Sequence, residues 1–425
     1  MDGDSVIVVG AGLAGLVAAR RLAASGADVT VVERRSTVGG RVRTETRDGF
    51  TLDRGFQVLF TAYPAVRREL DLDALDLRHF RPGAVIARPG SRSVLSDPLR
   101  DLRAAPASIR NSEVTLSDKL RTLLLRQHVG TRTESEIFRS TDRSIRSSLR
   151  EWGFSKDYVD HFVAPFYGGI TLDRSLSTSK RVFEYTFKAL SAGEIAVPAA
   201  GMRAIPEQLA ERARTAGAQI SCSERVRSIE DDGGGTVTVE TDAETMGADA
   251  VVVATDPKEA HRLTEVESIP RDARGCVTQY YRLPAESAPR TGRKILLNAA
   301  DPSPNTVVPM SEVAPEYAPD GAALFNATFL GDAAQERAAS ALAEEARLTL
   351  ESWYPERDFS ALEPIRTHRI EFAQFDQPPG IHESLPDARA PGGRTYLAGD
   401  YTAWSSIQGA MRSGREAARA VERDR

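Results

Sequence analysis

Short apolar runs that end at turn residues open the chain. Val6 to Val9 are uninterrupted apolar residues, followed by glycines and by an Ala- and Leu-rich stretch of helical periodicity that reaches about Ser25. After Gly26, a second apolar run covers Val29 to Val32. Continuous short apolar runs are typical of parallel strands that are buried on both faces. Residues 6–33 therefore predict a strand, a helix and a second, parallel strand.

The same patterns predict elements along the rest of the chain. Residues 97–192 have mostly helical periodicity, and a long helix is expected over 333–353. Further strands are expected over 276–330, where the proline-rich stretch 302–319 interrupts them. Apolar or alternating runs predict shorter strands at 220–223, 226–229, 236–240, 250–254 and 395–398, and a terminal helix from about Ile407. Strands and helices mixed in this way indicate an α/β fold.

The composition excludes several classes of protein but does not identify a function. The 425 residues allow two or more domains, and 41% hydrophobic with 27% charged residues is ordinary for a soluble protein. No apolar run reaches the ~20 residues of a membrane span, and the acidic Met1 to Asp4 does not resemble a signal peptide, so we expect a cytoplasmic protein. The net charge of −5 gives no nucleic-acid signature, and the six histidines and two cysteines lack metal-ligand spacing, so we expect no metal site.

Three glycines stand between the first strand and the first helix. Gly10, Gly12 and Gly15 have the spacing G-x-G-x-x-G, and Glu33 ends the second strand. Gly10 permits a tight turn, Gly12 lets the backbone approach a pyrophosphate, and Gly15 lets the helix pack close to the strand. The helix N-terminus offers N–H groups to phosphates, and Glu33 offers an acceptor to a ribose. These residues predict a dinucleotide site, which a nicotinamide or a flavin coenzyme would both fit.

A second group of motifs decides between the two coenzymes. Gly39-Gly40-Arg41 follows Glu33 closely, and Asp53-Arg54-Gly55-Phe56 comes next. These motifs resemble the GG-doublet flavoproteins, the superfamily of amine oxidases, protoporphyrinogen oxidases and phytoene desaturases. The resemblance implies FAD, with the glycine doublet beside it and Arg41 near its pyrophosphate. A nicotinamide coenzyme, the alternative, would leave residues 39–55 unused.

The C-terminal sequence YLAGDYTAWSSIQGAMRSG, residues 396–414, resembles the ending of the phytoene desaturases. The resemblance implies that Asp400 accepts hydrogen bonds from the ribityl hydroxyls and that the helix starting near Gln408 directs its N–H groups to the flavin ring. The loop from Asp400 to Gly409 is shorter than is usual in the family, and Gln408 stands where an acid is common. No cysteine follows Cys276, so we expect noncovalent FAD.

A third segment, the strand pair over 224–229 and 248–257, resembles the family's internal strands, and Val226 matches the valine that pins the adenine. We therefore expect a Rossmann-type, glutathione-reductase-like FAD-binding domain from 1–60, 203–260 and 386–425. A discontinuous, mixed α+β substrate domain is expected from 61–202, which is largely helical, and 261–385. The resemblance predicts these cofactor contacts: Gly10, Gly12, Leu13, Ala14, Gly15, Glu33, Arg34, Gly39, Gly40, Arg41, Gly55, Phe56, Val226, Ala254, Gly399, Asp400, Ser406, Ile407, Gln408 and Ala410.

The substrate side offers no obvious catalytic base. A flavin takes a hydride from an activated C–H bond when the protein supplies alignment and a dry cavity. We therefore expect two-electron dehydrogenation of an apolar substrate, in the manner of desaturases, by hydride transfer to flavin N5. Oxidation of an amine or a porphyrinogen, or a non-redox isomerisation with FAD, are the alternatives. Ile407 stands where amine oxidases have an aromatic residue, which favours dehydrogenation of an apolar substrate over amine oxidation. Trp404, Gln57 and Tyr281 are candidates for the cavity wall.

Residues 100–150 form a basic segment with eleven Lys or Arg and six Asp or Glu, a net charge of +5. The remainder of the chain is correspondingly acidic. A solvated surface and contact with an anionic membrane surface, such as the inner membrane, are both consistent with this charge.

Overall fold

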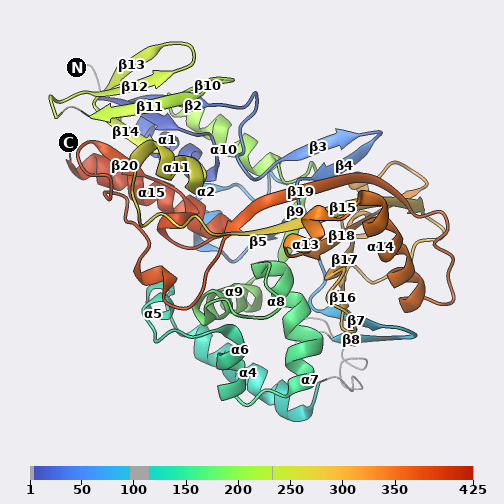
Figure 1. Ribbon diagram of the computed structural model, residues 1–425. Coiled ribbons are helices and arrows are strands. Elements are labelled where there is room, and N and C mark those ends of the chain that lie inside the picture. Colours follow the sequence, from blue (N-terminus) through green and yellow to red (C-terminus); the bar gives the residue numbers. More distant parts are fainter. Residues whose placement is uncertain (1–3, 96–113, 232, 425) are drawn as a thin grey trace.

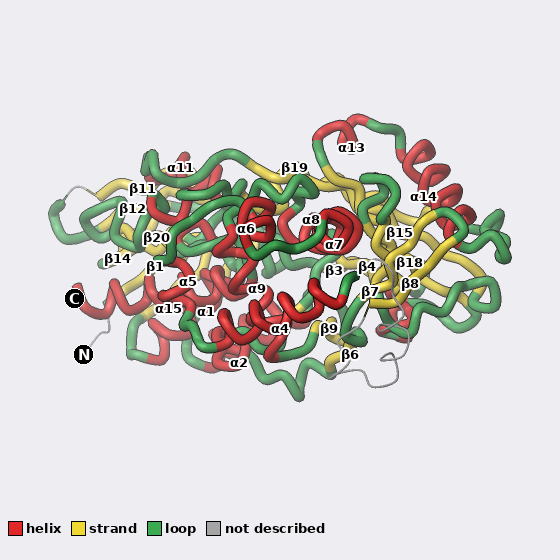
Figure 2. Tube along the Cα trace, turned by 90° about the horizontal axis from the view of Figure 1, so that it is seen from below, coloured by secondary structure: helices red, strands yellow, loops and turns green. Residues whose placement is uncertain are grey.

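The computed structural model describes residues 4–95, 114–231 and 233–424. Figure 1 shows the parallel sheet and its helices at the upper left, a larger sheet at the right, and a group of helices at the bottom. Figure 2 shows the same parts from below, with that group of helices on the near side. Three segments that are far apart in the sequence meet in the parallel sheet, so the two chain ends lie close to it.

The parallel sheet has the strand order β10-β2-β1-β14-β20. Val6 and Val8 point to the helices on one face, whereas Ile7 and Val9 pack on the other face against a three-stranded antiparallel sheet. Burial on both faces explains the uninterrupted apolar runs of the sequence. The strands of the parallel sheet are β1 (Ser5–Val9), β2 (Asp28–Glu33), β10 (Gln219–Cys222), β14 (Ala250–Val253) and β20 (Thr395–Leu397).

Helices α1 and α15 pack against each other over one face of this sheet, beside α10 and α2. Their bounds are α1 (Leu13–Ala24), α2 (Pro64–Glu69), α10 (Ala204–Thr215) and α15 (Ile407–Asp424). The small sheet on the opposite face consists of β11 (Val226–Asp231), β12 (Val237–Thr241) and β13 (Thr245–Ala248), and α11 (Pro257–Thr264) follows β14. The short apolar strands and the terminal helix that the sequence predicts are confirmed.

The larger sheet has seven strands in the order β19-β15-β18-β17-β16-β7-β8, and every pair except β16 with β7 is antiparallel. One face packs on helix α14, which buries Leu342, Leu350 and Trp353 against it. The strands are β7 (Ala84–Arg88), β8 (Ser91–Leu95), β15 (Ala273–Pro284), β16 (Ile295–Asn298), β17 (Thr306–Pro309), β18 (Ala322–Leu330) and β19 (Glu363–Phe375).

The prediction of a single helix over residues 333–353 is wrong. The structure has α13 (Asp332–Glu336) and α14 (Ala339–Trp353), because Arg337 and Ala338 adopt extended backbone conformations between them. Helical periodicity continued through this break, so the sequence pattern did not reveal it. The proline-rich stretch contains α12 (Met310–Val313) and the 3₁₀ turn η2 (Pro315–Tyr317).

A helical lobe covers residues 116–192, as the periodicity predicted, whereas residues 97–113 of that prediction lie outside the described residues. Its helices are α4 (Leu116–Gly130), α5 (Glu134–Phe138), α6 (Ile145–Glu151), α7 (Lys156–Tyr158), the π-helix η1 (Val159–Val163), α8 (Ala164–Thr171) and α9 (Lys180–Ala192). They enclose an apolar core of their own. The remaining elements are β3 (Thr44–Arg47), β4 (Phe50–Asp53), β5 (Leu59–Phe60), β6 (Leu77–His79), β9 (Ile195–Pro198), η3 (Ile381–Glu383) and η4 (Asp400–Thr402). None of the helices that the structure describes is long and apolar enough to span a bilayer.

Candidate functional site

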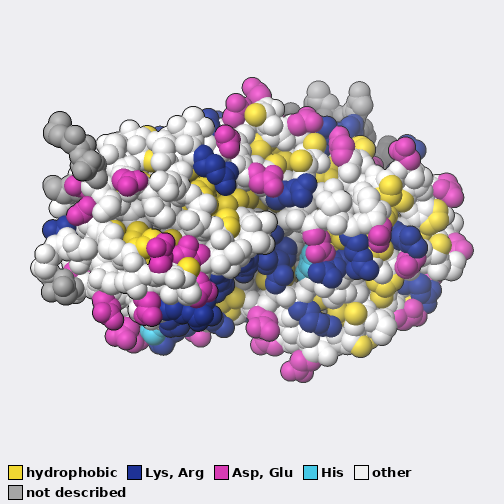
Figure 3. Space-filling model, turned by 90° about the horizontal axis from the view of Figure 1, so that it is seen from above, with side chains coloured by type: hydrophobic (Ala, Val, Ile, Leu, Met, Phe, Trp, Pro, Cys, Tyr) yellow, Lys and Arg dark blue, Asp and Glu magenta, His cyan; other side chains and the backbone are white. Residues whose placement is uncertain are grey.

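A long cavity of about 780 Å³ connects the parallel sheet with the helical lobe. One end lies at the carboxyl ends of β1 and β2, beside Gly10 and Glu33. The other end lies between α8, α9 and the larger sheet, where Phe166 and Thr306 line it. Figure 3 shows Lys and Arg side chains gathered around the hollow between the two halves of the molecule. Open parallel sheets bind ligands at this carboxyl edge.

The glycine turn at the first end is built for close backbone approach. Gly10 has a φ of +106° and donates its N–H to Val32 O over 2.8 Å. A Cβ atom on Gly15 would collide with the carbonyl oxygen of Gly10, so only glycine lets α1 start this close to β1. The second glycine loop packs on the first, since Gly39 N donates to Ala11 O over 2.8 Å. The two loops together form one wall of the cavity.

Glu33 lies at the end of β2 with its side chain 5% exposed. Its carboxylate accepts hydrogen bonds from Ala11 N and from Arg35 N, each over 2.9 Å. A carboxylate has about four acceptor positions, so Glu33 retains capacity for the hydroxyls of a ribose. The backbone bonds hold the carboxylate in place at the cavity wall.

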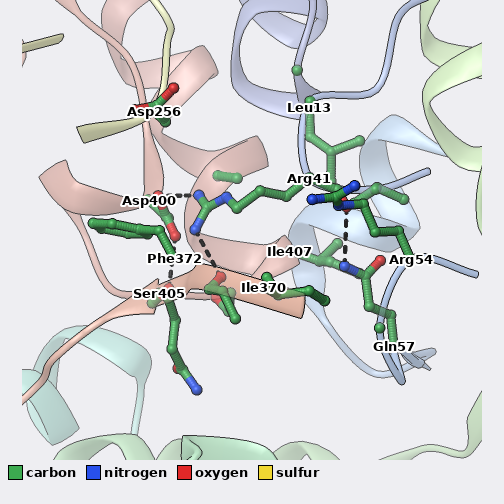
Figure 4. Close-up of a pocket in the computed structure, with 18 of the residues that line it drawn as sticks. Leu13, Arg41, Arg54, Gln57, Asp256, Ile370, Phe372, Asp400, Ser405 and Ile407 are labelled. Carbon is green, nitrogen blue, oxygen red and sulfur yellow. Dashed lines mark hydrogen bonds and ion pairs between the residues drawn. The ribbon is translucent and has the colours of Figure 1, made fainter. Parts of the chain in front are cut away.

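An ion pair crosses the cavity from the second glycine loop to the C-terminal segment. Arg41 Nη2 lies 2.6 Å from Asp400 Oδ1, and Ser405 Oγ donates to Asp400 Oδ2 over 2.7 Å (Figure 4). Arg41 also donates to Ala373 O over 3.2 Å. Burial lowers the pKa of Arg41, but the Asp400 carboxylate more than offsets this and leaves the pKa raised. The pair fixes a cation beside the N-terminus of α1.

Several polar atoms of the cavity wall are buried without a hydrogen-bond partner among the described residues: Arg43 Nε, Gln57 Oε1, Glu224 Oε1 and Arg225 Nε. Burial, together with the neighbouring cations Arg35 and Arg54, lowers the pKa of Arg43 to about 10. Unpaired buried polar groups cost ~1–3 kcal/mol each, and a cluster of cations repels itself. A polar, anionic ligand relieves both penalties, as the diphosphate of a dinucleotide would.

The far end of the cavity is apolar by contrast. Helices α8 and α9, their flanking loops and strands β9 and β16–β18 supply no charged side chain to it among the described residues. Their contributions are Phe166, Gly169, Ile170, Leu172, Val182, Thr186, Ile195, Ile295, Thr306 and Thr328. The cavity therefore combines a polar half, suited to a dinucleotide, with an apolar half.

The family model for flavin-containing amine oxidoreductases matches residues 13–422. The chain belongs to this family. Its resemblance to the GG-doublet flavoproteins is thereby confirmed, and the cavity described above fits the flavin that the family uses. The members of the family are flavin-dependent oxidoreductases, so the expectation of an oxidoreductase is confirmed at that level.

Curated relatives include both carotenoid and porphyrin enzymes. The chain is 31% identical over 290 residues to a phytoene dehydrogenase of Streptomyces griseus, covering 61% of this chain and 56% of that protein. It is 30% identical over 176 residues to protoporphyrinogen oxidase 2 of Arabidopsis thaliana, covering 40% of this chain and 33% of that protein. The chain thus spans about half the length of the first relative and a third of the second.

A solved structure shows the same fold over the full length of the chain. An oxidoreductase from Methanosarcina mazei superposes with a TM-score of 0.76 at 17% identity, covering 99% of this chain and 100% of that one. The predicted α/β class with a Rossmann-type domain is confirmed by this likeness and by the parallel sheet.

Most of the residues predicted to contact the flavin cofactor line the cavity. Two do not. Gly15 lies beneath the glycine turn, where it serves the packing of α1. Gln408 is 2% exposed and directs its side chain away from the cavity, accepting from Ala65 N over 2.8 Å and donating to Glu134 Oε2 over 3.1 Å. The side chain of Gln408 therefore does not reach the cavity and instead holds α15 against α2 and α5. That the N–H groups at the start of α15 face the flavin stays a prediction.

Of the three candidates for the cavity wall, Trp404 and Gln57 line the cavity and Tyr281 does not. Trp404 Nε1 donates to Glu134 Oε1 over 3.2 Å, and Gln57 Nε2 donates to Arg41 O over 3.2 Å. Tyr281 is buried in the core between the larger sheet and α14, because its position on β15 faces that helix. The prediction for Tyr281 is wrong.

Sequence reasoning missed one wall of the cavity. Ile370, Phe372 and Gln374 of β19 line it, and Figure 4 shows Ile370 and Phe372 near Asp400 and Gln57. Strand β19 reaches this place through its pairing with β15, about a hundred residues earlier in the chain. No strand was predicted over residues 363–375, and the residues of β19 carry no sign of the cavity by themselves.

Proposed function

We propose that the chain binds FAD noncovalently in this cavity and dehydrogenates an apolar substrate by two electrons. The observation that carries the proposal is the continuity of the cavity, from a glycine-lined polar half to an apolar half without a charged side chain from the helical lobe. A substrate beside α8 and α9 meets no charged side chain from the helical lobe, which favours a hydrocarbon-like molecule over a charged one.

Different residues of the polar half would bind different parts of the cofactor. Glu33 would hold the adenosine ribose, Val226 the adenine, the N-terminus of α1 with Arg41 the diphosphate, and Asp400 the ribityl chain. Bound FAD supplies the acceptor for a hydride. Helix α15 starts at Ile407 beside the cavity, so the positive end of its dipole would favour negative charge on a flavin bound there. The apolar walls exclude water and align the substrate C–H bond.

The attachment of the cofactor is proposed to be noncovalent. Cys276 is the cysteine that lines the cavity among the described residues, and burial raises the pKa of its thiol to about 11. A thiol with that pKa is scarcely ionised near neutral pH and so is a poor nucleophile toward the flavin ring. Heat or acid treatment of the purified yellow protein releases the flavin into the supernatant; flavin that stays with the protein pellet contradicts the proposal.

The reaction is tested by mixing the purified protein anaerobically with a polyene precursor, a porphyrinogen and a set of amines, while the visible flavin absorbance is recorded. We expect the apolar polyene class to bleach the flavin and the amines to leave it unchanged. Bleaching by amines alone would assign the chain to amine oxidation. Conversion of a substrate without any bleaching, and without dependence on an electron acceptor, would instead indicate a non-redox isomerase.

A further inference from the structure

Helix α4 carries a row of exposed leucines. Leu116, Leu120, Leu123 and Leu124 are 74%, 56%, 51% and 57% exposed, and their spacing of four, three and one residues places them on one side of the helix. Among the described residues, one other large apolar side chain is comparably exposed, Leu348 on α14. We call this row the leucine face of α4. Four adjacent exposed leucines form a patch that a solvated surface does not require.

The opposite side of α4 already has its partners. Leu125 and Val129 are buried in the core of the helical lobe. Asp118 is fully buried, and its carboxylate accepts hydrogen bonds from Ser155 N over 2.8 Å and from Thr115 Oγ1 over 2.6 Å. The helix is therefore held by its buried side, and the leucine face is directed outward. Figures 1 and 2 both show α4 along the outer surface of the lobe.

Cations border the leucine face. Lys119 and Arg126 lie along one side of it and Arg121 lies on the other, by the 100° spacing of helical residues. The one carboxylate of the helix, Asp118, is buried on the opposite side. An apolar stripe bordered by Lys and Arg is the pattern of a helix that lies in the interface of an anionic bilayer.

We propose that α4 docks on an anionic lipid surface, with its four leucines in the headgroup–acyl boundary and its cations against lipid phosphates. The basic segment of the sequence covers residues 100–150. Its first part, residues 100–113, lies outside the described residues, so the proposal rests on α4 alone. The helix packs against α9, where Arg126 Nη2 donates to Ser191 O over 3.3 Å. Val182 and Thr186 of α9 line the cavity. The lipid surface would therefore lie one helix away from the apolar half. That this half holds an apolar substrate rests on the proposed function.

The test is sedimentation of the purified holoprotein with vesicles of phosphatidylcholine, with and without about one third phosphatidylglycerol. We expect binding to the anionic vesicles that weakens with salt. The triple variant Leu120→Gln, Leu123→Gln, Leu124→Gln should lower the partition coefficient at least about tenfold, since three apolar side chains no longer insert. Leu348→Gln, a substitution at equal exposure on another helix, should leave binding unchanged.

Several results would overturn the proposal. Absence of wild-type binding to anionic vesicles, or equal binding of the triple variant, removes the lipid surface as the partner. A wild-type dimer that the triple variant converts to a monomer in size-exclusion chromatography assigns the leucine face to a second copy of the chain. A melting temperature lowered in the triple variant but not in Leu348→Gln shows that the chain itself covers the face. The flavin spectrum and its anaerobic bleaching are measured separately, so a failure here leaves the proposed reaction untouched.

Discussion

Asp400 joins the second glycine loop to the C-terminal segment. Its carboxylate binds the Arg41 guanidinium and the Ser405 hydroxyl, and its side chain is 3% exposed. We expect Asp400→Asn to lower the free energy of unfolding by about 2 kcal/mol, because the partly buried Arg41 guanidinium loses its counter-charge. The variant should also retain less flavin. Urea denaturation and the ratio of flavin to protein absorbance measure the two effects. Ser405→Ala removes one neutral donor and should cost about 1 kcal/mol or less.

Asp53 gives the protein a specific dependence on pH. Burial raises the pKa of Asp53 to about 6, although hydrogen bonds from Thr44, Met202 N and Tyr317 lower it in part. Because the folded state then binds the proton more tightly than the unfolded state, this group stabilises the fold at low pH and loses that contribution as pH rises from about 4 to about 6. The difference in unfolding free energy between wild type and Asp53→Asn should change by roughly 2 to 3 kcal/mol across this range. A difference that is constant with pH would contradict the shifted pKa.

Among the elements, α5 is short, but its first residue makes a hydrogen bond and an ion pair to the C-terminal helix α15. Its first residue, Glu134, accepts hydrogen bonds from Tyr185 OH over 2.9 Å, Trp404 Nε1 over 3.2 Å and Gln408 Nε2 over 3.1 Å. It also pairs with Arg412 over 2.7 Å. Glu134→Ala should therefore cost about 3 kcal/mol, and Glu134→Gln, which keeps the acceptor oxygen, clearly less.

Glu134→Ala should also free the indole of Trp404 at the cavity wall. The fluorescence assigned to Trp404, taken as the difference between matched proteins with and without Trp404→Phe, should shift to longer wavelength in the alanine variant. An unchanged difference spectrum would show that the packing of Tyr63 and Phe138 around the indole suffices to hold it.

The elements also show where prediction from the sequence succeeds and where it stops. Residues 6–33 were predicted well because the strand, the glycine turn and the helix depend on neighbours a few positions away. The directions of Gln408 and Tyr281 depend on Glu134 and on α14, which are distant in the chain and carry no local signal. The break in the helix at Arg337 was likewise invisible, since both halves keep a helical pattern of apolar residues.

At the scale of the whole molecule, family motifs located the polar half of the cavity, while the apolar half emerged only from the packing of separate segments. Phe166, Ile195 and Thr328 come from three different elements and share no sequence pattern. The residue types that line the apolar half are also common in the hydrophobic core, so the type of a residue does not reveal whether it is buried in the core or beside a cavity. The leucine face of α4 was missed for a related reason: its leucines look like core residues until the opposite side of the helix is seen to be occupied.

The strand order of the parallel sheet has one consequence for how the protein is made. Strand β20 completes the edge of that sheet, and it is followed by Asp400 and α15, all from the last part of the chain. A nascent chain emerging from the ribosome N-terminus first carries the glycine turn long before it carries these residues. The chain therefore lacks both the closing strand and the partner of Arg41 until residues 395–400 have been synthesised. The parallel sheet and the ion pair at the cavity are accordingly completed late, only after this distant segment has left the ribosome.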